Sequence, residues 1–140
     1  MWKIDKIKVL IVEPDKEPYE QEIEHTLETL QSIVNGVIDI IEIEKNVDLI
    51  INDEGKILNL EFNRVIPNDV IAGTFIVAGQ KNGETISLTE EQIEKYKKVF
   101  SLKSDEGVIA FLRQEVKHSS RTPELNLTGI ENLKGFITKD

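Results

Sequence analysis

Cysteine is absent from this chain of 140 residues, which excludes disulfide bonds, thiolate metal sites, iron–sulfur clusters and cysteine nucleophiles. Histidine occurs only twice, at His25 and His118, so no two-histidine metal motif at helical spacing can form. No apolar run is long enough to span a bilayer, and the first residues lack the apolar stretch of a signal peptide. We therefore expect a cytoplasmic protein that binds neither a metal nor a membrane.

The usual motifs of catalytic and cofactor sites are also missing. Gly55-Lys56 is followed by Ile57 where a phosphate-binding loop needs Ser or Thr. No glycine-rich dinucleotide fingerprint and no Gly-x-Ser-x-Gly elbow occurs. These absences favour a protein without a cofactor that is not an enzyme. An unrecognised enzyme that uses Glu13 or Glu54 as an acid or base stays an alternative.

Aromatic residues are scarce, at 6%, so the core is expected to consist of branched aliphatic side chains. The formal net charge is −9, and its whole excess lies in the first hundred residues, since the remainder carries six basic and six acidic residues. This balance argues against direct binding to nucleic acid or to an anionic membrane, because both favour clustered Lys and Arg.

The first half of the chain predicts a strand–helix–strand unit. Ile7–Val12 is a short run of branched residues, typical of a strand buried on both faces. Pro18 suits the first position of a helix that ends at Asn35-Gly36, and a strand follows over Val37–Ile43. The apolar stripe of that helix would consist of Ile23, Leu27, Leu30 and Val34.

The second half predicts further strands and a second helix. We expect a hairpin of Asp48–Ile51 and Ile57–Leu60, then a loop over Glu61–Asp69 and a strand over Val70–Ala78. Asn82-Gly83 predicts a tight turn into a short strand over Glu84–Ser87. Thr89-Glu90-Glu91-Gln92 fits a capping box, and it predicts a helix that buries Ile93, Tyr96, Val99 and Phe100.

The fold class is therefore α+β. We expect a mixed or antiparallel sheet of about five to six strands with two helices packed on it. Residues 1–101 would form this domain, and residues 102–140 a C-terminal extension that is helical or irregular. Within the extension the spacing predicts a helix over Ser104–Val116, a linker over His118–Glu124 and a loosely defined last stretch.

Two sets of charged residues are candidates for function. Glu20, Glu24 and Glu28 align along the expected first helix, where they could imitate DNA phosphates, meet a basic partner or simply be solvated. Asn63-Arg64 lies in the expected loop, where binding residues are often carried. The Arg64 fork could hold a phosphate or carboxylate, or it could pair with Glu13 or Glu54.

The turn and loop residues, taken in order, resemble an uncharacterised family of phages, conjugative elements and Gram-positive bacteria, domain of unknown function 3846, over about residues 7–101. The matching residues are Glu13-Pro14, Tyr19, Leu30-Gln31, Val34, Gly36, Asn52, Glu54-Gly55-Lys56, Asn63-Arg64, Asp69, Ala72-Gly73-Thr74, Leu88-Thr89, Tyr96 and Phe100. The resemblance implies an accessory role in a mobile element, near antirestriction genes, and it implies no reaction.

Several polar residues of this pattern are hard to explain by packing, and they are our candidates for ligand binding: Glu13, Gln31, Asn52, Glu54, Asn63 and Arg64. The leading hypothesis is a non-catalytic binding protein whose partner is a host protein or a small anionic ligand. The alternative is an acidic DNA mimic that inhibits a restriction enzyme or another DNA-binding enzyme. A homodimer is compatible with either, because edge strands of small α+β domains pair readily.

Overall fold

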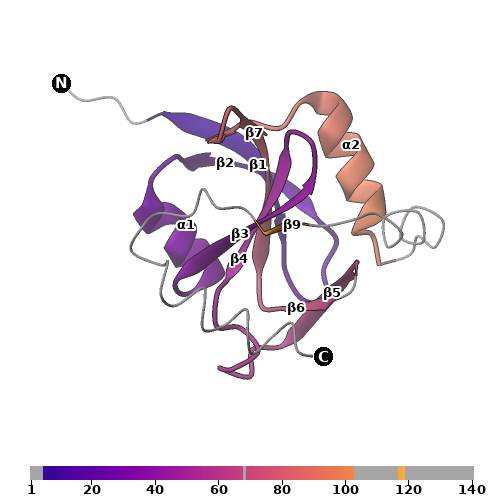
Figure 1. Cartoon of the computed structure of the whole chain (residues 1–140). Helices are drawn as coiled ribbons and strands as arrows, with labels where there is room; N and C mark the ends of the chain where they lie inside the picture. Colours follow the sequence, from indigo (N-terminus) through magenta and orange to yellow (C-terminus); the bar gives the residue numbers. More distant parts are fainter. Residues whose placement is uncertain (1–4, 68, 103–116, 119–140) are drawn as a thin grey trace.

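The computed structural model describes residues 5–67, 69–102 and 117–118 of the chain (Figure 1). Its elements are β1 (Lys6–Val12), β2 (Tyr19–Glu24), α1 (Leu27–Val34), β3 (Ile38–Glu44), β4 (Val47–Asn52), β5 (Phe62–Ile66), β6 (Asp69–Ala72), β7 (Phe75–Lys81), β8 (Glu84–Ile86), α2 (Glu90–Val99) and β9 (Lys117–His118). The predicted α+β class is confirmed, and a strand–helix–strand start is present with β2 inserted after β1.

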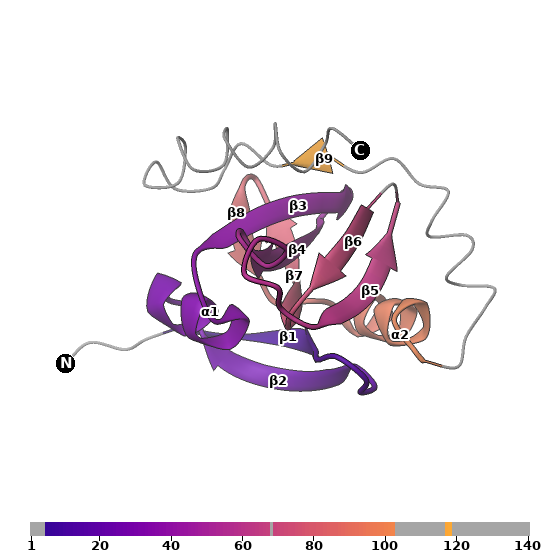
Figure 2. The same cartoon turned by 90° about the horizontal axis from the view of Figure 1, so that it is seen from below.

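The main sheet is antiparallel throughout its described pairs. Its strands follow the order β2-β1-β7-β4-β3-β9, and β8 adds to β7. A separate two-stranded sheet consists of β5 and β6. Figure 2 shows the main sheet curving, with the β5–β6 sheet beside it.

Each face of the main sheet packs against its own core, and each core includes one helix. Strand β1 shows the alternation, since Val9 belongs to the core under α1 and Leu10 to the core under α2. Ile66 and Ile71 of the small sheet join the α2 core. Figure 1 shows α1 and α2 on opposite sides of the sheet, so two helices are packed on it as predicted.

Short-range signals predicted several ends and turns of the fold correctly. Asn35 ends α1 in the left-handed conformation, with φ of 71°. Asn82 and Gly83 both have positive φ in the β7–β8 turn, and Thr89 and Gln92 form both hydrogen bonds of the capping box. The aliphatic and aromatic stripe expected for α2 is buried.

The prediction that the first helix begins at Pro18 was wrong. Tyr19–Glu24 forms strand β2, and the helix is only Leu27–Val34, capped by the side chain of Thr26. The apolar residue Ile23 is buried in the α1 core as expected, but it reaches that core from the strand. Glu-rich segments favour helix locally, yet the pairing of six residues with β1 overrides this preference.

The hairpin predicted over Asp48–Ile51 and Ile57–Leu60 was also wrong. Strand β4 pairs with β3 on one side and with β7 on the other, so both of its edges are occupied. The chain instead turns back through Lys45-Asn46, where Asn46 has φ of 73°. Residues 53–59 form a series of turns that leave Ile57 and Leu58 exposed.

The segment expected to be a loop, Glu61–Asp69, contains strand β5 and the start of β6. The single strand expected over Val70–Ala78 is divided into β6 and β7 at Gly73, whose φ is 85°. A side chain at Gly73 would also meet Leu60, since its Cβ would lie 2.8 Å from Leu60 Cδ1. Glycine therefore ends β6 at the point where the chain changes sheets.

Most of the C-terminal extension lies outside the described residues, including the helix predicted over Ser104–Val116. Lys117 and His118 form the short strand β9 on the edge of β3, so His118 is part of a strand and not of a linker. Among the helices that the structure describes, none is long and apolar enough to cross a membrane.

Candidate functional site

Arg64 is almost fully buried, with 8% of its surface exposed, and its guanidinium donates to protein groups. Its Nε bonds the carbonyl oxygen of Phe100 at 2.9 Å, and its Nη2 bonds that of Lys16 at 2.6 Å. Its Nη1 bonds both the carbonyl oxygen and the Oδ1 of Asn63, at 3.2 and 2.6 Å. Four donors are therefore used by groups of the chain itself.

This environment also explains the electrostatics of Arg64. Burial lowers the pKa of its guanidinium from the ordinary value, and the nearby carboxylates of Glu17 and Asp15 oppose that shift. Neither Glu13 nor Glu54, the two partners suggested by the sequence, receives a hydrogen bond from Arg64 within the described residues. The guanidinium thus joins β5 to the β1–β2 loop and to the end of α2.

Asn63, the residue before Arg64, holds the same region of β5. It is buried, and its Nδ2 donates to the carbonyl oxygens of Val12 and Gly73, each at 2.8 Å. Val12 ends β1, and Gly73 lies between β6 and β7. One amide therefore fastens the small sheet to the main sheet, and its oxygen orients the Arg64 fork.

Asn52 ends β4 and caps helix α1. Its Nδ2 donates to the carbonyl oxygens of Val34 and Asn35, at 3.0 and 3.2 Å, and its Oδ1 accepts from the backbone N–H of Glu54 at 2.7 Å. These bonds satisfy carbonyl groups that the end of a helix leaves without a helical partner. A side chain at Gly36 would meet this amide, since its Cβ would lie 2.7 Å from Asn52 Nδ2.

The side chains of the other three ligand-binding candidates form no hydrogen bond with Arg64 in the described part of the chain. Glu13 follows β1 and accepts from the Tyr19 hydroxyl at 2.5 Å, and this bond lowers the pKa of Glu13. Gln31 lies on α1, and its backbone carbonyl accepts from Gly36 N–H. Glu54 is exposed in the turn after β4. The structure therefore brings together Asn63 and Arg64 but does not gather all six candidates at one place.

The three carboxylates of the expected acidic helix lie on two elements. Glu20 and Glu24 belong to strand β2, and Glu28 lies in the first turn of α1. Glu20 accepts from Lys97 of α2 at 3.0 Å, which lowers the pKa of Glu20. Glu24 and Glu28 share a shallow surface depression. A single helical line of acidic residues is therefore not formed.

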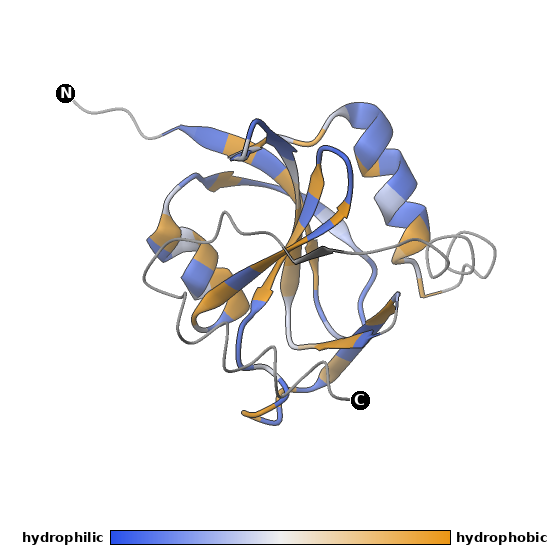
Figure 3. Ribbon diagram, in the orientation of Figure 1, coloured by the Kyte–Doolittle hydropathy of each residue, from blue (hydrophilic) through white to orange (hydrophobic). Residues whose placement is uncertain are grey.

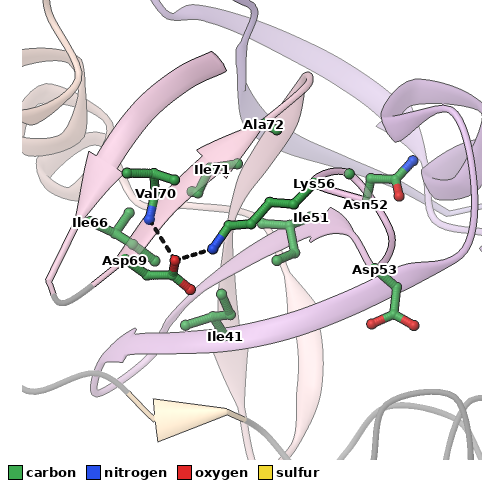
Figure 4. Close-up of a pocket in the computed structure, with 11 residues that line it drawn as sticks. Ile41, Ile51, Asn52, Asp53, Lys56, Ile66, Asp69, Val70, Ile71 and Ala72 are labelled. Atoms are coloured by element: carbon green, nitrogen blue, oxygen red, sulfur yellow. Dashed lines mark hydrogen bonds and ion pairs between the residues drawn. The ribbon is translucent and has the colours of Figure 1, made fainter. Parts of the chain in front are cut away.

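A small cavity lies between β4 and β6, where Lys56 and Asp69 form an ion pair (Figure 4). Its volume is about 30 Å³, and aliphatic side chains such as Ile41 and Ile66 line it. Ligand pockets for metabolites usually measure at least about 300 Å³, so this cavity has room for water at most. Figure 4 shows Lys56 reaching across to Asp69 while Asp53 points away.

Exposed apolar side chains are concentrated in the segment beside this cavity. Of the eight large hydrophobic side chains exposed in the described part of the chain, five belong to residues 57–70. We call this group the apolar patch; it consists of Ile57, Leu58, Phe62, Val65 and Val70. Figure 3 shows hydrophobic residues on the β5–β6 sheet and on the turn that precedes it.

Strand register and one close backbone approach place the patch residues in the same part of the molecule. Val65 lies directly opposite Val70, and Phe62 lies opposite Ala72. The turn carrying the other two patch residues packs on β6, since a Cβ at Gly55 would lie 2.7 Å from the carbonyl oxygen of Ala72. The sequence pattern gave no sign of the patch, because it favoured a paired strand over residues 57–60 and a loop over residues 61–69.

Among the residues described, no group of three or more His, Cys, Asp or Glu side chains is placed to hold a metal ion. A comparison with protein families matches residues 7–101, more than half of the chain, to a family described as Domain of unknown function (DUF3846). No curated protein and no solved structure matches the chain.

Proposed function

The chain belongs to the family Domain of unknown function (DUF3846), and from this premise we propose that it is a non-catalytic binding module that recognises a protein partner through the apolar patch. One observation carries the proposal. The residues that looked like ligand-binding groups, Asn63 and Arg64, are buried, and they fasten the sheet whose outer face exposes Phe62 and Val65. In this proposal Asn63 and Arg64 hold the β5–β6 sheet in place and do not contact the partner themselves.

The exposure of the patch supports a protein as the partner. The exposed fractions range from 40% for Val70 to 58% for Phe62, and Val65 lies directly opposite Val70 in the β5–β6 register. Apolar side chains exposed in one region mark interaction sites when the patch is large. A small anionic ligand is a weaker candidate at Arg64, because its donors bond carbonyl oxygens and Asn63.

The biological setting follows from the family resemblance of the sequence. Such domains resemble accessory proteins of phages and conjugative elements, so we propose a host protein as the partner and an anti-defence role as one use of the binding. An acidic DNA mimic stays the alternative prediction, with its carboxylates now placed on β2 and α1. An enzyme that uses Glu13 or Glu54 is a further alternative, although a lowered pKa does not suit a general acid at Glu13.

The test is site-specific photocrosslinking in cells that express the chain naturally. A benzophenone side chain at Val65 should give one discrete protein adduct, and the substitution Phe62→Ser should remove it. The same group at Glu91, which is exposed on α2, serves as the control and should give no such adduct. Equal adducts at Val65 and Glu91, or none at Val65, would contradict the proposal.

A further inference from the structure

Strand β2 forms one end of the main sheet and has a neighbour on one side. All six of its residues pair with β1, from Tyr19 opposite Ile11 to Glu24 opposite Lys6, and no other strand among the described residues pairs with it. Figure 2 shows its outer edge away from the other strands and away from the β5–β6 sheet. An edge of this kind presents backbone donors and acceptors in a fixed row.

The register identifies which residues point those groups outward. In an antiparallel pair, residues alternate between positions that bond the partner and positions whose backbone groups point away from it. The N–H of His25 donates to the carbonyl oxygen of Asp5 at 2.8 Å, so Ile23, Gln21 and Tyr19 also point toward β1. The outward positions are therefore Glu20, Glu22 and Glu24.

Hydrogen bonds on the far side of β1 agree with this alternation. Lys8, which lies opposite Glu22, accepts from the N–H of Leu88 at 2.9 Å and donates to Ser87 Oγ at 2.9 Å. Its backbone groups therefore point away from β2, as expected for a pair that is not hydrogen-bonded. The edge of the sheet thus combines three outward backbone units with three carboxylates. The carbonyl oxygen of Glu24 also accepts from the N–H of Thr26 at 3.0 Å, and that of Glu22 accepts from Gln21 Nε2 at 3.5 Å.

The chain itself shows which side chains fit beside these carboxylates. On β1, Lys6 lies opposite Glu24 and Lys8 lies opposite Glu22, so the inner neighbour presents a cation at alternate positions. Glu22 and Glu24 are exposed and form no ion pair within 4.0 Å among the described residues. Opposite charges across neighbouring strands are favourable, and like charges are unfavourable.

We propose that the outer edge of β2 binds an extended segment of another protein that carries Lys or Arg at alternate positions and adds to the sheet as an antiparallel strand. Backbone hydrogen bonds to Glu20, Glu22 and Glu24 hold the segment, and its cations lie beside their carboxylates. The surface is separate from the apolar patch, so it does not depend on the function proposed above.

The same geometry disfavours a second copy of this chain as the occupant. Outward positions must face outward positions for the hydrogen bonds to form, and all three are glutamates. Any antiparallel pairing of two β2 edges would therefore place Glu beside Glu. The acidic residues select a basic strand and prevent edge-to-edge association of the protein with itself.

The test uses a synthetic peptide, acetyl-Thr-Lys-Val-Lys-Val-Lys-Thr-amide, with the full chain. Binding is followed by calorimetry, and amide hydrogen exchange is measured by NMR. We expect slower exchange of the amides of Glu20, Glu22 and Glu24. A second peptide with N-methyl groups on its three lysine amides keeps the charge but removes the donors that face β2, and it should not bind.

Two double variants with the same change in net charge provide the matched comparison. Glu22→Gln with Glu24→Gln should weaken binding about twofold to thirtyfold, whereas Glu91→Gln with Glu94→Gln, on exposed positions of α2, should leave it within error. The proposal is overturned if the unmodified peptide does not bind at millimolar concentration, or if the N-methylated peptide binds equally well. It is also overturned if amide exchange in β2 does not change, or if both double variants weaken binding equally.

Discussion

The guanidinium of Arg64 donates from Nε to the carbonyl oxygen of Phe100 at 2.9 Å, and so connects β5 with the residue that ends α2. The two residues are 36 positions apart in the chain. Through its Nη2 the same guanidinium reaches the carbonyl oxygen of Lys16 in the β1–β2 loop. One side chain therefore fixes three segments around the small sheet.

Replacing Arg64 should destabilise the protein. Arg64→Ala leaves the carbonyl oxygens of Phe100 and Lys16 without their donors, and we expect a loss of about 2–4 kcal/mol in the free energy of unfolding, measured by urea denaturation. Arg64→Lys should recover only part of it, because an ammonium lacks the planar fork. If Arg64 instead served an external anion, Arg64→Ala would leave the urea midpoint unchanged.

Asn52 and Gly36 should be energetically coupled. Asn52→Ala removes the bonds to the carbonyl oxygens of Val34 and Asn35 and should cost about 1–3 kcal/mol. Gly36→Ala should also destabilise the protein, because its Cβ would come too close to the side-chain amide of Asn52, which is held by these two hydrogen bonds. When Asn52 is already Ala, Gly36→Ala should lower the free energy of unfolding by a smaller amount. A double-mutant cycle of urea titrations measures this difference. Additive effects would show that the two residues do not interact.

The Tyr19–Glu13 hydrogen bond should affect stability at both ends of the pH range. Burial and Glu13 raise the pKa of Tyr19 from 10.0 to about 12, so this stabilisation is complete below pH 10 and is lost as pH rises toward 12. The pKa of Glu13 is lowered from 4.5, chiefly by Tyr19, so its stabilisation is present above that value and is lost as pH falls below it.

Tyr19→Phe should therefore raise the pKa of Glu13 toward 4.5, and a carboxyl carbon NMR titration of Glu13 measures the change. Lys16→Met is the control. The hydrogen bond and the charge of Lys16 each lower the pKa of Glu13 less than the Tyr19 hydrogen bond does, and we expect removal of Lys16 to produce the smaller change. A larger effect of Lys16→Met would contradict this assignment.

The two faces of the small sheet should respond differently to the same substitution. Val70→Ser, on the exposed face, should change the free energy of unfolding by less than about 0.5 kcal/mol. Ile71→Ser, at the next residue, removes a side chain that is 2% exposed and belongs to the α2 core, so it should cost several times more. Equal costs would show that the patch is not solvent-exposed.

Local chemistry explains which parts of the fold were predictable. The Thr89 capping box, the Asn82-Gly83 turn and the Asn35 stop each depend on residues within four positions of one another. The buried run of β1 is similarly evident, because both of its faces are apolar. For such features the neighbouring residues alone determine the conformation.

The wrong secondary-structure predictions share one cause, which is the pairing of strands that are distant in the sequence. Strand β2 and the turns after β4 were misassigned because the order of strands decides which edges are open, and that order is not a local property. One edge of β1 is free to pair with Tyr19–Glu24. Both edges of β4 are occupied by β3 and β7, so residues 57–60 cannot pair with it. The same ordering made an acidic edge strand out of the expected acidic helix.

The candidate site was predictable in part. The sequence by itself singled out Asn52, Asn63 and Arg64 as polar residues that packing does not explain, and it suggested a ligand or, for Arg64, pairing with Glu13 or Glu54. Only the tertiary structure decided that their partners are carbonyl oxygens of Val34, Val12 and Phe100, brought close from distant segments. The physical reason is that burial removes water as a competitor, so the groups bond the backbone that folding places beside them.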